Sequence, residues 1–89
     1  MKVIETNNDD HVFQVTIKNK GIVFVDGFEL ASRCSEIDGV EEGNAKPQDV
    51  ANAVREVGWS EEDMSKFTHH ELFSVGSKVL VAIEDLGKP

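Results

Sequence analysis

The sequence predicts an α+β fold, with a small N-terminal antiparallel β-ribbon of two or three strands packed on three or four α-helices. Hydrophobic residues alternate with a period of two over residues 1–25, and they take helical spacing after that point. A helix-start pattern of apolar residue, capping residue, two spacers, acid and apolar residue begins at Val25, Trp59 and Phe67. Because the chain has 89 residues, we expect one small domain, with the ribbon in 1–25 and the helical part in 26–89.

The ribbon is predicted from two β-rich runs around a turn. Phe13, Val15 and Ile17 alternate with polar residues, and a second run of β-branched and aromatic residues follows over 22–25. The Asn-x-Gly turn that ends at Gly21 joins the two runs as a hairpin. Residues 2–5 can add a third strand. A ribbon this small is marginal in water, so one of its faces is expected to lie on the helices.

Two helices are predicted in the middle of the chain. The first is expected over 26–37, with Gly39 as a left-handed C-cap, and a polar loop follows over 38–46. Pro47 suits the first position of the second helix, which Gly58 ends. A short third turn or helix is expected over 60–66.

The last helix, predicted over 69–86, has the strongest pattern. Its apolar residues cover about half of the helical circumference, whereas docking on one domain needs roughly a third. They are Leu72, Phe73, Val75, Val79, Leu80, Ala82, Ile83 and Leu86, while Val81 stands among the polar residues. Either the rest of the domain covers this apolar half, or part of it forms a second surface. For the second case, the candidate partner-binding residues are Phe73, Leu80, Val81 and Ile83.

Helix capping accounts for many of the polar residues that could otherwise suggest catalysis. Glu29, Asp63 and Glu71 are the acids of the three helix-start patterns. The adjacent pair His69-His70 projects its side chains about 100° apart, whereas zinc-binding histidines on one helix are usually four residues apart. A structural or solvated role is therefore favoured for the pair over a metal or pH-sensing role. We expect no metal site.

The single cysteine, Cys34, lies on the apolar stripe of the first helix, in line with Leu30 and Ile37. This position favours a small buried core residue over a nucleophile, which is activated at a helix N-terminus. The sequence contains neither a glycine-rich phosphate loop nor a nucleophile elbow. We therefore expect no catalytic residues, no cofactor and no enzyme activity. An enzyme would need a pocket that brings Cys34 to a histidine.

The formal net charge of −8 limits the possible partners. Binding to nucleic acid needs clustered Lys and Arg, so nucleic acid and anionic membrane surfaces are disfavoured. The charge favours a basic protein partner instead. No apolar run approaches the roughly 20 residues of a membrane span, and the N-terminus lacks the apolar core of a signal peptide. We therefore expect a cytoplasmic protein.

The layout of the chain resembles the tail assembly chaperones of long-tailed bacteriophages. The ribbon over His11–Val25, the capped helix over Asp26–Ile37 and a C-terminal amphipathic helix that closes in Leu86-Gly87-Lys88-Pro89 carry this resemblance. Codons for Gly87-Lys88 can form the slippery run at which this family often makes a longer product by a −1 frameshift.

The resemblance implies a non-enzymatic role in the cytoplasm of a host bacterium. The protein would coat the tape-measure protein, present it to the tail-tube subunits and possess a surface suited to homo-oligomer formation. The alternative function is a small acidic inhibitor that mimics nucleic acid and blocks a basic nucleic-acid-binding protein.

Overall fold

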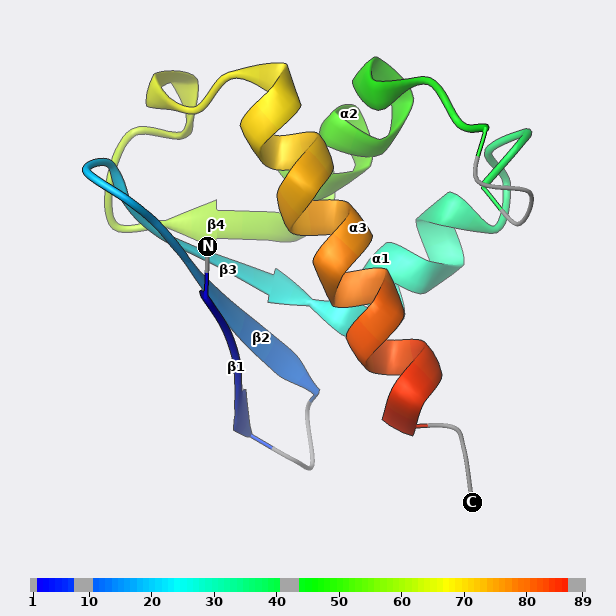
Figure 1. Ribbon diagram of the computed structural model, residues 1–89, viewed down its shortest axis with the longest axis horizontal. Helices are drawn as coiled ribbons and strands as arrows, with labels where there is room; N and C mark the ends of the chain where they lie inside the picture. The colour runs from blue at the N-terminus through cyan, green and yellow to red at the C-terminus, as the bar shows by residue number, and fades with distance from the viewer. Residues whose placement is uncertain (1, 8–10, 41–43, 87–89) are drawn as a thin grey trace.

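The computed structural model describes residues 2–7, 11–40 and 44–86, and the side chains of 11–40 and 44–84. Four antiparallel strands form one sheet in the order β1 (Lys2–Asn7), β2 (Val12–Ile17), β3 (Gly21–Asp26) and β4 (Gly58–Ser60), as Figure 1 shows. The first three strands confirm the predicted N-terminal ribbon. The Gly87-Lys88 pair of the proposed frameshift lies outside the described residues.

Three α-helices follow the ribbon, namely α1 (Gly27–Cys34), α2 (Pro47–Val57) and α3 (His69–Leu86). A single 3-10 turn, η1 (Met64–Lys66), precedes α3. The predicted α+β class is thereby confirmed. Pro47 occupies the first turn of α2, where its missing N–H has no intrahelical partner to lose. α3 packs along both α2 and α1.

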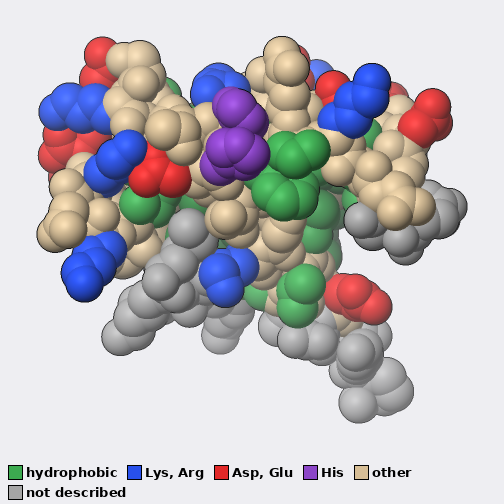
Figure 2. Space-filling model, turned by 45° about the horizontal axis from the view of Figure 1, so that its top comes forward, with side chains coloured by type: hydrophobic (Ala, Val, Ile, Leu, Met, Phe, Trp, Pro, Cys, Tyr) green, Lys and Arg blue, Asp and Glu red, His purple; other side chains and the backbone are tan. Residues whose placement is uncertain are grey.

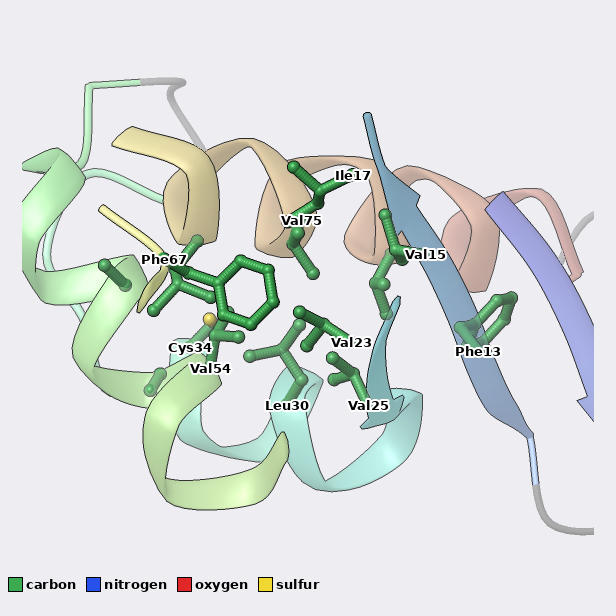
Figure 3. Close-up of a cluster of buried hydrophobic side chains, with 14 residues drawn as sticks. Phe13, Val15, Ile17, Val23, Val25, Leu30, Cys34, Val54, Phe67 and Val75 are labelled. Carbon is green, nitrogen blue, oxygen red and sulfur yellow. The ribbon is translucent and has the colours of Figure 1, made fainter. Parts of the chain in front are cut away.

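The hydrophobic core lies between the sheet and the helices (Figure 3). The strands contribute every second residue, as the period of two predicts. The buried side chains of the sheet are Phe13, Val15, Ile17, Val23 and Val25. Those of the helical part include Leu30, Cys34, Val54, Phe67, Leu72, Val75 and Val79. The burial of Cys34 agrees with its predicted place in the core.

The opposite face of the sheet is much more open. Its side chains on β2 and β3 alternate with the core residues and are only partly buried. Phe24 pairs with Trp59 across β3 and β4, and the two rings stack with centroids 5.8 Å apart. Trp59 remains 48% exposed in this arrangement. An aromatic cross-strand pair thus stands on the open face of the sheet.

The strands are not all N-terminal, because β4 forms after α2 from residues predicted to begin a helix. Ser60 does not cap a helix: its hydroxyl donates to the Ile22 carbonyl (2.6 Å) and accepts from the Glu62 N–H (3.1 Å). Asp63 is the N-cap of η1 and accepts from the Ser65 N–H (3.0 Å). The second helix-start prediction was therefore wrong. The open edge of β3 offers backbone partners that local sequence cannot reveal.

Gly58 makes the close join between α2 and β4. A Cβ at this position would lie 2.6 Å from the Val54 carbonyl oxygen and 3.0 Å from that of Phe24. Both obstacles are backbone atoms, which side-chain rotation cannot move away. The absence of a side chain at Gly58 therefore lets α2 turn directly into a strand beside β3.

The first helix ends at Cys34, earlier than the predicted end at residue 37. The N–H groups of Glu36 and Ile37 donate to the carbonyls of Arg33 and Cys34, which tightens the chain into a turn. Gly39 does have a left-handed backbone, with φ of +88°, but it lies in the following loop. The prediction of Gly39 as the C-cap was wrong, whereas its predicted left-handed conformation is confirmed.

Candidate partner-binding surface

The start of α3 is fixed by the capping box that the sequence predicts. The Thr68 N–H donates to Oε1 of Glu71 (2.8 Å), and the Glu71 N–H donates to Oγ1 of Thr68 (3.2 Å). Phe67 and Leu72 flank the box and are both buried. This arrangement positions the first turn of α3, and with it the outward-facing residues that follow.

A lysine from the ribbon joins this capping box. Nζ of Lys20, in the β2–β3 turn, donates to Oε1 of Glu71 (2.7 Å) and to the Lys66 carbonyl (3.0 Å). The Lys20 ammonium is the main cause of a lowered pKa at Glu71, and the Thr68 N–H adds to the effect. Glu71 therefore has a structural role in joining the hairpin to α3.

Two of the four predicted partner-binding residues meet at a small apolar cavity. Part of its wall is formed by Phe73 and Leu80, which lie about two helical turns apart on α3. Both side chains are partly exposed. The other described lining residues are Val40, Ala45, Val50 and Ser77, and the cavity volume is about 130 Å³. An apolar protein cavity of about 150 Å³ can hold a benzene ring. This cavity therefore matches a single apolar side chain of a partner.

Val81 extends this surface along α3. Phe73, Ser77 and Val81 follow one another at intervals of four residues, which places them on one strip of the helix. The Val81 side chain is 57% exposed. Figure 2 shows hydrophobic side chains exposed beside histidines on this part of the molecule. We name Phe73, Ser77, Leu80 and Val81 the α3 strip.

Ile83, the fourth predicted residue, faces the sheet instead. It is partly buried and packs against the core. A Cβ added to Gly27 would lie 2.6 Å from Cδ1 of Ile83 and 2.7 Å from Cε2 of Phe13. The structure thus separates Ile83 from the α3 strip and gives its side chain a packing role between α3, α1 and β2.

One further hollow shares a residue with the α3 strip, and a second hollow adjoins the first. Leu80 and Val40 also line a cavity of about 390 Å³ beside Cys34 and Ile37. Ile37 in turn lines a third hollow of about 350 Å³ between α1 and α2. The cavity at Phe73 and these two hollows therefore lie next to the loop that follows α1.

The candidate catalytic groups do not converge among the described residues. Burial raises the pKa of the Cys34 thiol, which keeps it protonated and weakly nucleophilic. His69 and His70 are exposed at the start of α3, with ring centroids 4.1 Å apart. His11 instead contacts Phe28 edge to face, at 4.3 Å. In the described part of the chain, no three His, Cys, Asp or Glu side chains are placed to hold a metal ion.

Two exposed aromatic side chains, Phe28 and Trp59, occur where the sequence does not predict them. Phe28 is 56% exposed on α1, although it was expected only as a spacer in the first capping pattern. Trp59 was expected to staple a helix entry and stands on the open sheet face. Phe24 was predicted only as part of a β-branched and aromatic run, with no face assigned to it. Trp59 could not be identified as the partner of Phe24, because β4 was not predicted.

Acidic side chains are distributed over several elements. They occur on α1, on α2, in the segment 61–63 and on α3. Some have local partners: Arg33 pairs with Glu56 at 3.2 Å, and Lys66 pairs with Glu62 at 3.3 Å. The excess negative charge is thus spread over the helical side of the molecule rather than concentrated at one catalytic position.

The helices of the described residues include none with the length and apolarity needed to cross a membrane. Comparison of the chain with protein-family models, with curated proteins and with solved structures gave no match in any of the three. The residues and geometry of the chain itself must therefore support any functional proposal.

Proposed function

We propose that this protein is a non-enzymatic assembly factor that binds a protein partner through the α3 strip, in the manner of a phage tail assembly chaperone. The observation that carries the proposal is the partly exposed wall that Phe73 and Leu80 form at an apolar cavity, with Val81 exposed beside it. An apolar helix face beside a cavity is suited to hold a helical or extended segment of another protein.

The partner in this proposal is the tape-measure protein, with the tail-tube subunits recruited to the complex. A chaperone must cover apolar side chains of its client without enclosing them, and an open strip on one helix allows this. Coating a long client would place several copies side by side, so a homo-oligomer on the client is part of the proposal.

Co-expression with the tape-measure protein encoded in the same genome tests this function. The wild-type chain should increase the soluble yield of the tape-measure protein and elute with it as one complex. The Phe73→Ser/Val81→Ser variant should lose at least most of this effect, because it replaces two apolar contacts with hydroxyls. The Ser74→Ala/Lys78→Ala variant, altered at two other positions of α3, should retain it.

Two results would contradict the proposal. One is an unchanged soluble yield with the wild-type chain, and the other is equal activity of the Phe73→Ser/Val81→Ser variant with its fold intact by circular dichroism. The coding DNA gives an independent check, because a slippery heptamer at Gly87-Lys88 that overlaps a −1 frame would support the assignment. A gene outside any phage tail cluster and without that heptamer would oppose it.

The alternative proposal, a nucleic-acid mimic, makes a different prediction. It needs carboxylates in duplex-like spacing and salt-sensitive binding to a basic nuclease or DNA-binding protein. Inhibition of such a protein, reversed by salt and unaffected by Phe73→Ser/Val81→Ser, would favour this alternative.

A further inference from the structure

We infer that the α3 strip and the neighbouring α1–α2 hollow together take an amphipathic protein segment that carries lysine or arginine beside its apolar anchor. This inference rests on the proposed protein-binding function and specifies the chemistry of the partner. The apolar cavity at Phe73 would hold the apolar anchor, and the charged α1–α2 hollow would hold the lysine or arginine.

The two regions lie next to each other in the fold. Val50 lines the apolar cavity, and the preceding residue, Asp49, lines the α1–α2 hollow. Ile37 and Val40 connect the same regions on the other side, through the cavity that they share. A single segment crossing the first turn of α2 can therefore contact both.

The α1–α2 hollow is lined mainly by charged and polar side chains. Its charged lining consists of Glu36, Asp49, Glu56 and one cation, Arg33. Arg33 pairs with Glu56, and within the described residues Glu36 and Asp49 have no ion-pair partner. Asn52 adds a polar side chain to the lining, and Ile37 and Ala53 add apolar surface.

This lining is complementary to a long cationic side chain. The methylene groups of lysine or arginine can lie on Ile37 and Ala53, while the cation reaches Glu36 or Asp49. The Arg33–Glu56 pair is half-exposed on both sides, so it is weak and can rearrange to admit a second cation. The net charge of −8 favours encounter with such a basic segment and disfavours a second copy of this acidic chain as the occupant of this site.

Labelled model peptides test the inference with the full-length protein. The first peptide has leucine on one helical face and lysine on the other, and the second has glutamate in place of every lysine. Fluorescence anisotropy should show binding of the Leu/Lys peptide and much weaker binding of the Leu/Glu peptide. Phe73→Ser/Val81→Ser should weaken the Leu/Lys complex, because its apolar anchor loses its contacts.

Matched charge variants locate the cationic contact. Glu36→Gln/Asp49→Asn should weaken Leu/Lys binding about three- to ten-fold and reduce its salt dependence. The control variant Glu29→Gln/Glu61→Gln removes the same charge from exposed positions outside the hollow. Glu29 lies in the first turn of α1, as Asp49 does in α2. This control should change the affinity by less than about two-fold. A specific loss in the first variant alone supports the inference.

Other outcomes overturn it. Equal weakening by both charge variants would mean that only net charge attracts the peptide, and no weakening by either would exclude the hollow. If both peptides bind equally and Phe73→Ser/Val81→Ser weakens both, the α3 strip still binds protein and only the basic-segment inference fails. If that variant leaves binding of the Leu/Lys peptide unchanged, the shared site is excluded, whereas the co-expression assay still decides the proposed function separately.

Discussion

The two faces of the sheet differ in how far they are buried. The inner face packs its valines and Phe13 against three helices and is buried, whereas the outer face keeps its side chains partly exposed. The same strands supply both faces, so composition of the strands alone does not explain the contrast. What differs is the covering layer: α1, α2 and α3 close the inner face and leave the paired rings of Phe24 and Trp59 in contact with solvent. Stability should therefore depend mainly on one face of the sheet.

The largest expected difference separates the inner core from the surface of α3. Leu72 is fully buried, and its truncation in Leu72→Ala should reduce the free energy of unfolding by about 2–5 kcal/mol. Val81→Ala truncates an exposed residue of the same helix and should change it by no more than about 0.5 kcal/mol. Urea unfolding followed by circular dichroism measures both. Similar losses in the two variants would show that α3 is not divided into a buried and an exposed side.

The outer face should make a smaller contribution, concentrated in one aromatic pair. A double-mutant cycle with Phe24→Ala and Trp59→Ala should give a coupling of about 0.5–1 kcal/mol, because the rings stack across β3 and β4. The control cycle of Thr16→Ala with Trp59→Ala should be additive within about 0.5 kcal/mol. Additivity in the Phe24–Trp59 cycle would mean that β4 is not held by this contact.

The smallest effect is expected where the hairpin meets α3, and it should depend on pH. The folded-state pKa of Glu71 is lowered, mainly by Lys20, so between the two pKa values the unfolded chain binds more protons than the folded one. The stabilisation is therefore complete above the unfolded pKa of about 4.3 and is lost as the pH falls through the folded pKa. Replacing the charge in Glu71→Gln should cost about 0.2–1 kcal/mol at pH 7.

Unfolding curves at neutral and acidic pH check this expectation. The difference between wild type and Glu71→Gln should shrink as the carboxylate becomes protonated, while an exposed control, Glu61→Gln, should show a smaller pH-dependent difference. A stability difference for Glu71→Gln that stays constant from pH 7 to pH 3 would contradict a charge-based role for the Lys20–Glu71 contact.

Part of the candidate surface could be predicted from helical spacing. The half-apolar pattern of α3 identified Phe73 and Leu80 as candidates, and Val81 was chosen as an apolar residue on the polar side. The structure places the first two at one cavity and exposes the third. Helical spacing could not separate Ile83 from these residues, because the packing of the other elements decides which side of a helix is buried. The acidic hollow was also inaccessible to sequence, since Glu36 comes from the turn after α1 and Asp49 from the first turn of α2.

By itself the sequence determined the local elements: the period of two gave the ribbon, and the Thr68–Glu71 capping box gave the start of α3. These features depend on contacts between residues close in the chain, so their signals are local. Only the tertiary structure decided that residues 58–60 form a strand, and that the cavity at Phe73 and Leu80 is linked to an acidic hollow through the hollow at Val40 and Ile37. The reason is physical: an unpaired strand edge and a helix junction provide hydrogen-bond and packing partners from distant segments, and these outweigh a weak local preference.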